Sequence, residues 1–257
     1  WGSNVPLTRT PDAHFLTEVR YKGTKVVSVS PDYAESTTSS DAWLNVKAGT
    51  DAALAMAMGH VILKEYYIDK ETPYFKEYAK EFTDMPFLVR VEDINGAVQP
   101  GRFLNAKDLG SKEDGADFQT VLIDETTHEI VVPNGTMGDR HTHPEKWNLR
   151  LENRNTGAKI DPRLSVFDQR EDVTIVKLPY FGDEEHEGVI ERAIPTITVQ
   201  TVDGPVKVTT VYDLILANYG IDRGIGGEVA KAYTDDTPYT PTWQEKITGV
   251  KADIAIA

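Results

Sequence analysis

Apolar residues in the first ninety positions follow helical and strand-like spacings in turn. Helical spacing begins after Pro11 and recurs over residues 52–65 and 73–82, where one face of each segment is apolar. Two short runs rich in β-branched or other apolar residues, 25–30 and 42–46, lie between the first and second helices and are typical of buried parallel strands. This order of elements predicts an α/β fold with a partly parallel, Rossmann-like sheet.

The pattern changes near Pro86. Strand-like runs separated by Gly, Asn and Asp then cover residues 87–91, 118–123, 129–132 and 172–177. Helical spacing returns at 211–219 and 242–248. We therefore predict an α/β nucleotide-binding domain formed by residues 1–90 plus 191–257, with a β-rich insertion over 91–190.

Both ends of the sequence have unusual patterns. The chain opens on a Gly- and Pro-containing loop, residues 1–6, and it ends in residues 250–257, which look like the first turns of a helix without a cap. We expect both ends to lie inside a larger domain.

Charge restricts the classes of partner. The 257 residues include 27 Lys and Arg against 41 Asp and Glu, a formal net charge of −14, which disfavours nucleic acids and anionic lipid surfaces. The longest strongly apolar stretch, 52–63, is shorter than the roughly 20 residues that cross a bilayer. We expect no direct membrane contact, and no nucleic acid as a partner. Cysteine is absent, so the sequence holds no disulfide and no thiolate-ligated cluster.

Three polar loops occur where an α/β sheet would form a ligand site. They are Gly2-Ser3-Asn4, Ser30-Pro31-Asp32 and Gly49-Thr50-Asp51, each after a presumed or expected strand. Glycines let backbone amides approach a phosphate, and a carboxylate accepts two N–H bonds from a guanine edge. The alternative is that the glycines only form turns and that Asp51 only caps a helix. The residues alone leave both interpretations open.

Other polar groups carry weaker signals. His141 and His143 with Glu145 have a spacing that could bind a metal, but Pro144 and the turn-forming residues around them favour a solvated loop. Asn134-Gly135-Thr136 matches a glycosylation acceptor, which matters only in a secreted protein. Arg9 is as consistent with a surface charge as with a phosphate contact. We predict no metal ligand and no catalytic residue from these groups.

Several longer motifs resemble one enzyme family. The segments are WGSNVPLTRTPDAHFLTEVRYKGTK (1–25), VVSVSPDYAES (26–36), KAGTDAALAMAMGHVILKE (47–65), KWNL (146–149), LPYFG (178–182), TTVYDLILANYG (209–220) and ITGV (247–250). They are similar to the dimethyl-sulfoxide-reductase superfamily of molybdopterin oxidoreductases, and among its members to the catalytic subunits of membrane-bound nitrate reductases. The resemblance extends over the whole chain and is weaker across residues 95–175.

The resemblance implies which residues bind a cofactor. In this family the three loops hold one of two molybdopterin guanine dinucleotides that carry the molybdenum. It implies that Trp1 and the Gly2-Ser3-Asn4 loop approach its phosphate and pterin side. Ser30 and Asp32, on either side of Pro31, would face the guanosine, and Asp51 of Gly49-Thr50-Asp51 would accept from the guanine N1–H and amino group. Ser30 stands where most members have Asp and would be a weaker ribose acceptor.

The resemblance also implies a reaction and partners. The full subunit would reduce nitrate to nitrite with two electrons, and its molybdenum ligand and 4Fe-4S ligands would lie outside this chain. An iron–sulfur beta subunit and a cytochrome b-type gamma subunit would hold it peripherally on the cytoplasmic face of the cell membrane. Reduction of selenate, chlorate or perchlorate, oxidation of nitrite, and a non-catalytic scaffold or subunit-docking role are the alternatives.

Overall fold

The computed structural model describes residues 1–135, 150–180 and 188–257. These residues divide into two compact units, which are described separately. Unit 1 combines residues 1–61 with residues 232–257, and unit 2 covers residues 62–231. The division of 1–90 plus 191–257 from 91–190 stays a prediction.

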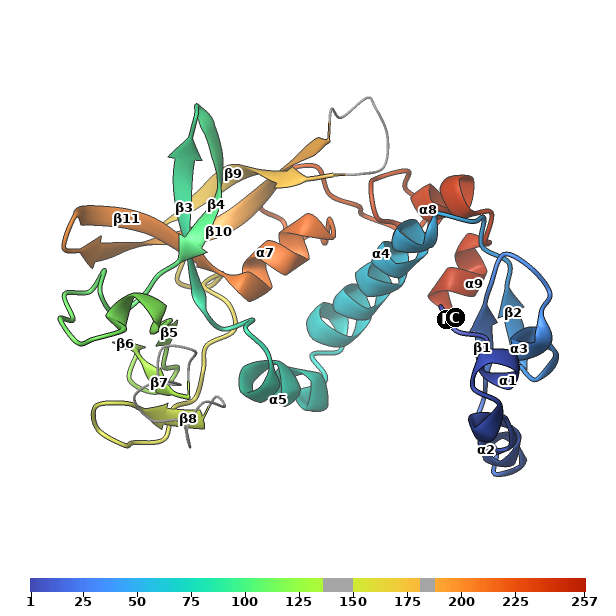
Figure 1. Cartoon of the computed structure of the whole chain (residues 1–257). Coiled ribbons are helices and arrows are strands. Elements are labelled where there is room, and N and C mark those ends of the chain that lie inside the picture. Colours follow the sequence, from blue (N-terminus) through green and yellow to red (C-terminus); the bar gives the residue numbers. More distant parts are fainter. Residues whose placement is uncertain (136–149, 181–187) are drawn as a thin grey trace. The chain divides into compact units, whose positions relative to one another are not determined.

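Unit 1 consists mainly of short helices around two strands (Figure 1). Its elements are α1 (Val5–Thr8), α2 (Thr10–Tyr21), β1 (Val27–Val29), α3 (Glu35–Thr38), β2 (Ala42–Leu44), α4 (Asp51–Ile62), α8 (Pro241–Thr248) and α9 (Ala252–Ile256). Strands β1 and β2 are parallel, and Val27 pairs with Ala42. The expected strands at 25–30 and 42–46 are therefore present in shortened form.

The core of unit 1 joins the two ends of the sequence. Leu44, Val46 and Leu54 pack with Val250 and Ala255, all of them buried. The backbone N–H of Lys47 also donates to the carbonyl oxygen of Thr248 over 3.0 Å. The turn before α4 is thereby held against the end of α8.

Unit 2 contains most of the strands (Figure 1). Its elements are η1 (Leu63–Asp69), α5 (Pro73–Phe82), β3 (Leu88–Ile94), β4 (Ala97–Phe103), η2 (Ala116–Phe118), β5 (Leu122–Ile123), β6 (Ile130–Val131), β7 (Pro133–Asn134), β8 (Arg150–Asn153), β9 (Asp172–Pro179), β10 (Val189–Thr201), β11 (Gly204–Thr210) and α7 (Val211–Asn218). Five of these strands form one sheet in the order β4-β3-β11-β10-β9. Leu88, Leu104, Val199 and Val208 belong to the core packed against it.

The five-stranded sheet confirms only part of the predicted fold class. Helices and strands are mixed, as expected, but every pairing in this sheet is antiparallel, and a parallel Rossmann-like sheet is not confirmed. The hairpin between β3 and β4 gives the physical reason for one of these antiparallel pairings. Asn95 and Gly96 both have positive φ, 58° and 81°, and such a two-residue turn reverses the chain so that its flanking strands are antiparallel. Among the named strands of the described residues, β1 and β2 pair in parallel, and an isolated parallel bridge joins Ile221 to Ala230.

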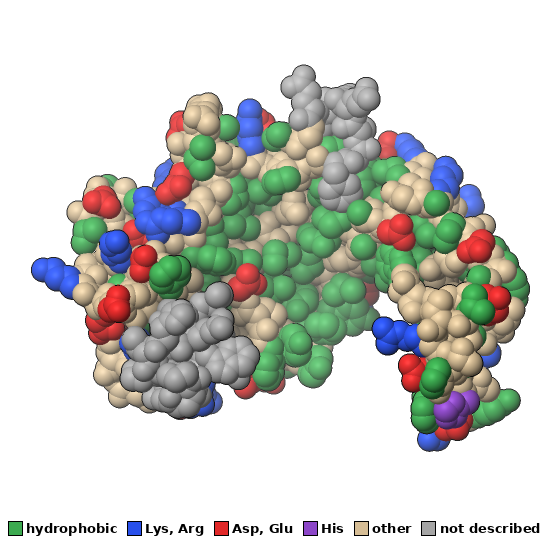
Figure 2. Space-filling view, in the orientation of Figure 1, with side chains coloured by type: hydrophobic (Ala, Val, Ile, Leu, Met, Phe, Trp, Pro, Cys, Tyr) green, Lys and Arg blue, Asp and Glu red, His purple; other side chains and the backbone are tan. Residues whose placement is uncertain are grey.

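Helix α5 illustrates how the apolar pattern is used. Its Ala79 is fully buried and Phe75 packs on the unit 2 core, as the amphipathic spacing predicts. A second aromatic row, Tyr74, Tyr78 and Phe82, is spaced four residues apart and faces solvent in this chain. Figure 2 shows hydrophobic side chains gathered on the surface around α5.

The helix predicted over residues 52–65 is not uniform. Regular α4 ends at Ile62, and the wider π-helical turn η1 follows. Ion pairs five residues apart accompany this turn, with Lys64 Nζ 2.6 Å from Asp69 Oδ2 and Lys70 Nζ 2.8 Å from Glu65 Oε2. None of the described helices is both long and apolar enough to span a bilayer.

Candidate functional site

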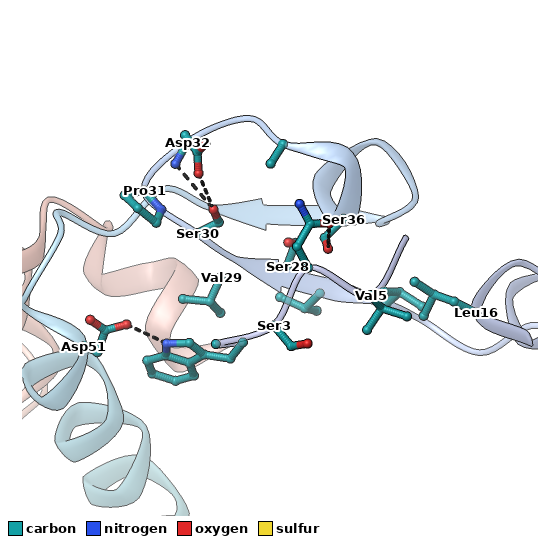
Figure 3. Close-up of a pocket in the computed structure, with 16 residues that line it drawn as sticks. Ser3, Val5, Leu16, Ser28, Val29, Ser30, Pro31, Asp32, Ser36 and Asp51 are labelled. Carbon is teal, nitrogen blue, oxygen red and sulfur yellow. Dashed lines mark hydrogen bonds between the residues drawn. The ribbon is translucent and has the colours of Figure 1, made fainter. Parts of the chain in front are cut away.

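A pocket of about 570 Å³ lies in unit 1, beside β1, the loop that follows it and the first residue of α4 (Figure 3). It is open to solvent and mixes polar with apolar side chains. The residues that line it are Trp1, Gly2, Ser3, Asn4, Val5, Leu16, Val26, Val27, Ser28, Val29, Ser30, Pro31, Asp32, Ala34, Ser36 and Asp51. Parallel strands place the loops at their carboxyl ends on one edge, which explains why segments distant in sequence converge here.

The pocket brings together most of the residues that the sequence singled out. Trp1, Gly2, Ser3, Asn4, Ser30, Pro31, Asp32 and Asp51 all line it. Gly49 and Thr50 are not among the lining residues. Gly49 has a φ of +80°, which L side chains rarely adopt, and Thr50 Oγ1 donates to the Lys47 carbonyl over 2.7 Å. Both residues shape the turn that leads into α4.

Asp51 and Trp1 are linked directly. The indole Nε1–H of Trp1 donates to Asp51 Oδ1 at 2.6 Å, marked by the dashed line at Asp51 in Figure 3. Among the described residues, Trp1 is the partner recorded for this carboxylate, and no backbone N–H of the first turn of α4 donates to it. Asp51 therefore presents an acceptor to the pocket.

The loop after β1 is held from two sides. Ser30 Oγ donates to Asp32 Oδ1 over 2.9 Å, and the backbone N–H of Asp32 donates back to Ser30 Oγ over 3.4 Å (Figure 3). On the other side, the Trp43 indole Nε1–H donates to the Ser30 carbonyl over 2.9 Å. Pro31 lies between these two anchored residues, so the loop has little freedom to move away from the pocket.

A second polar cluster lies where α1 meets α3. Asn4 Nδ2 donates to Glu35 Oε2 over 2.9 Å, and Ser36 Oγ donates to Asn4 Oδ1 over 3.1 Å. The Asn4 hydrogen bond, followed by a backbone one within Glu35, lowers the pKa of the Glu35 carboxyl. Glu35 stays charged near neutral pH and fixes the Asn4 side chain at the edge of the pocket.

The pocket also contains residues that sequence reasoning missed. They are Val5, Leu16, Val26, Val27, Ser28, Val29, Ala34 and Ser36. Residues 26–29 belong to β1 or directly precede it, so the neighbouring Ser30 loop could have drawn attention to them. Leu16 had no such signal, because its position depends on how α2 packs.

Comparison with known proteins decides the family. The model of the molybdopterin oxidoreductase family matches residues 1–222. The chain belongs to that family. It is 50% identical to the nitrate reductase alpha chain of Bacillus subtilis over all of its own length, and 47% identical to the respiratory nitrate reductase 1 alpha chain of Escherichia coli over 97% of it. The chlorate reductase subunit alpha of Ideonella dechloratans is 38% identical over 99%.

The chain spans about a fifth of the length of these relatives: 21%, 21% and 20%. Family membership implies a molybdenum–pterin cofactor. Within the described ranges, no group of three His, Asp or Glu side chains is arranged to hold a metal ion. The expected solvated loop with His141, His143 and Glu145 lies outside the described residues.

The chemistry of the pocket suits a ligand that carries N–H and hydroxyl donors. Its titratable side chains, Asp32 and Asp51, are carboxylates, which accept N–H and hydroxyl donors. Asp51 already accepts a ring N–H from Trp1. Neither Lys nor Arg is among the described lining residues, so a phosphate here would depend on backbone amides. Gly2, with a φ of +74° and no atom within 4 Å of where a Cβ would be, leaves its backbone approachable.

Proposed function

We propose that this chain is part of the molybdenum-containing catalytic subunit of a respiratory nitrate reductase. The observation that carries the proposal is the 50% and 47% identity to nitrate reductase alpha chains, against 38% to a chlorate reductase subunit, over nearly the same span. In the full subunit, nitrate would take up two electrons and two protons to give nitrite and water. The cofactor supplies the oxygen-atom transfer, and this chain supplies part of the surface that binds it.

The proposed ligand of the pocket is one guanosine end of the bis(molybdopterin guanine dinucleotide) form of the cofactor. Ser30 and Asp32 would meet the guanosine, and Asp51 would accept from the guanine N1–H and amino group. Gly2, Ser3 and Asn4 would approach the phosphates. Their convergence on one pocket supports these roles, as does the free lone-pair capacity of the Asp51 carboxylate. Gly49 and Thr50 would contribute through the turn that places Asp51.

The remaining parts of the proposal concern the protein beyond this chain. We propose that β1 and β2 belong to a parallel nucleotide-binding sheet completed by other strands of the subunit. A 4Fe-4S cluster, an iron–sulfur beta subunit and a cytochrome b-type gamma subunit would deliver the electrons. These partners would hold the subunit peripherally at the cytoplasmic face of the membrane. The alpha-chain names of the relatives support membership of a multisubunit complex.

The second candidate is reduction of another oxyanion, favoured by the 38% identity to the chlorate reductase subunit. The purified complex with the full subunit, assayed with a reduced viologen, separates the two. We expect kcat/KM for nitrate to exceed that for chlorate and selenate. A preference of tenfold or more for chlorate or selenate would assign the alternative substrate. A fully cofactor-loaded complex that reduces none of them would favour a scaffold role.

A further inference from the structure

We propose that Trp1 belongs to the guanine end of the pocket, where its indole positions the Asp51 carboxylate and its ring face stacks on the base. This inference rests on the proposed guanosine site. It moves Trp1 away from the pterin side, where the family resemblance would place it. The relationship that carries it is the 2.6 Å hydrogen bond between Trp1 Nε1 and Asp51 Oδ1, which joins residues fifty positions apart.

The hydrogen bond leaves the carboxylate able to bind guanine. A carboxylate offers about four lone-pair sites on its two oxygens. Guanine would use two of them, for its N1–H and its amino group, and the indole N–H uses one. Indole nitrogen is a donor only, so it cannot satisfy a guanine donor itself, and its effect on Asp51 is to restrict the side-chain rotation. Restricting a side chain before binding lowers the entropy lost when the ligand arrives.

The exposure of Trp1 adds a second function. The side chain is 50% exposed although its N–H edge is anchored, so part of its surface remains available within the pocket. Trp1 is the aromatic residue among the described lining residues. The other lining side chains are small, aliphatic or carboxylate groups, with one amide and one proline. An aromatic face beside a base-binding acceptor is the arrangement that stacks on a nucleobase, and stacking tolerates any base. Asp51, held by the indole N–H, would select guanine, whereas the ring face of Trp1 would add affinity without selecting.

This division of roles can be tested by base selectivity. The probes are GMP and AMP, and the protein is the full subunit prepared without cofactor, with the dissociation constant Kd measured by equilibrium dialysis. Trp1→Phe keeps an aromatic ring but removes the N–H donor, so we expect a GMP affinity lower by about 2- to 10-fold and an AMP affinity close to wild type. Trp1→Ala also removes the ring, and both nucleotides should bind about 10-fold more weakly or worse. Tyr21→Phe is the control, because Tyr21 is 86% exposed on α2 and does not line the pocket. It should leave both affinities unchanged.

Asp51→Asn separates this inference from the guanosine site itself. It should abolish the preference for GMP over AMP while leaving AMP binding unchanged, because stacking on Trp1 persists. If both Trp1 variants bind GMP and AMP as the wild type does, the role of Trp1 is wrong and the guanosine site stands. Tighter GMP binding by Trp1→Phe would show that the indole competes with the base, which also overturns the inference. If Asp51→Asn keeps the GMP preference, or the wild type binds no GMP, the guanosine site is itself wrong.

The folding of the variants is checked before their affinities are compared. The hydrogen bond from Trp1 to Asp51 is exposed. Thermal unfolding of each cofactor-free variant should therefore match the wild type. If Trp1→Ala unfolds early, Trp1→Phe still decides the positioning role through its effect on GMP alone. A Trp1→Phe variant with an unchanged GMP affinity contradicts that role.

Discussion

The indole Nε1–H of Trp43 donates to the carbonyl oxygen of Ser30 across 2.9 Å, and this bond ties β2 to the loop that follows β1. Trp43 also packs edge-on against Tyr33, with ring centroids 5.3 Å apart. One side chain therefore holds the pocket loop through its N–H and its ring. The two contributions can be separated by substitution.

Trp43→Phe keeps a ring against Tyr33 but removes the hydrogen bond to Ser30. We expect unit 1 to lose about 1 kcal/mol of stability and amide exchange in the Ser30 loop to become faster. Urea unfolding and hydrogen exchange measure the two effects. Tyr33→Phe is the control, because its side chain is 65% exposed and its ring is kept, and it should stay within about 0.5 kcal/mol of wild type. If Trp43→Phe destabilises unit 1 no more than Tyr33→Phe does, the hydrogen bond to Ser30 does not hold the loop, and ring packing does.

Asp51→Asn in the full subunit tests the main site residue. The amide still accepts from Trp1 but places donors opposite the guanine donors, so each unpaired contact costs roughly 1–3 kcal/mol, or about 5- to 150-fold in affinity. Thermal stability of the cofactor-free protein should be spared, since Asn also suits a helix start. Molybdenum content and nitrate reduction should both fall sharply. Full cofactor loading in this variant would reduce Asp51 to a helix-start residue.

Gly227→Ala should destabilise unit 2 more than the neighbouring Gly224→Ala. Both glycines have positive φ, +82° and +71°, so both substitutions cost roughly 1 kcal/mol of backbone strain. At Gly227 the new Cβ would lie 2.7 Å from the backbone nitrogen of Ala193, whereas at Gly224 it meets nothing within 4 Å. We expect an additional loss of about 1–3 kcal/mol at Gly227, measured by chemical unfolding. Equal losses would show that the β10 backbone can move aside.

Asp108 should make unit 2 sensitive to acid. Its burial by itself would raise the pKa of the carboxyl, but hydrogen bonds from Arg102 and from the Asn105 backbone outweigh burial and hold that pKa below its usual range. A lowered folded-state pKa stabilises the fold fully above the unfolded pKa, and this stability is lost as the pH falls through the folded pKa. We therefore expect part of the stability to disappear only below about pH 4.

Asp108→Asn tests this assignment. It removes the acid dependence due to this group and lowers the free energy of unfolding at pH 7 by about 1–3 kcal/mol, since Arg102 is half-exposed and can be solvated. Asp172→Asn is the control, because Asp172 pairs with Lys207 at the surface, and its effect should be smaller. An unchanged pH profile for Asp108→Asn would assign the acid sensitivity to other carboxylates.

The 257-residue chain by itself should not reduce nitrate with a viologen donor. No catalytic metal ligand was predicted in it, and the described residues hold no group of three His, Asp or Glu side chains suited to a metal ion. Molybdenum should also fail to copurify in stoichiometric amount, because the pocket is open on one side. A purified, contaminant-free sample that turns over nitrate would contradict the proposal that this chain supplies only part of the cofactor framework.

Local sequence alone determined where the main helices lie and which loops hold polar groups. The amphipathic spacing of α5, the apolar run of α4 and the loops at Ser30 and Asp51 are encoded within a few residues, because helix periodicity and turn preference act over short distances. The Asn95-Gly96 pair is also a local signal. Such a pair favours a two-residue hairpin turn and so predicts the antiparallel pairing of β3 with β4.

Tertiary structure decided which strands pair and which loops meet. A strand's alternating pattern specifies a buried face but not its neighbour, so the order β4-β3-β11-β10-β9 could not be derived from it. Likewise, the spacing around Trp1 contained no sign that its indole would meet Asp51. That contact depends on packing of β1, β2 and α4 within unit 1, which brings together residues fifty positions apart through long-range contacts that local patterns do not encode.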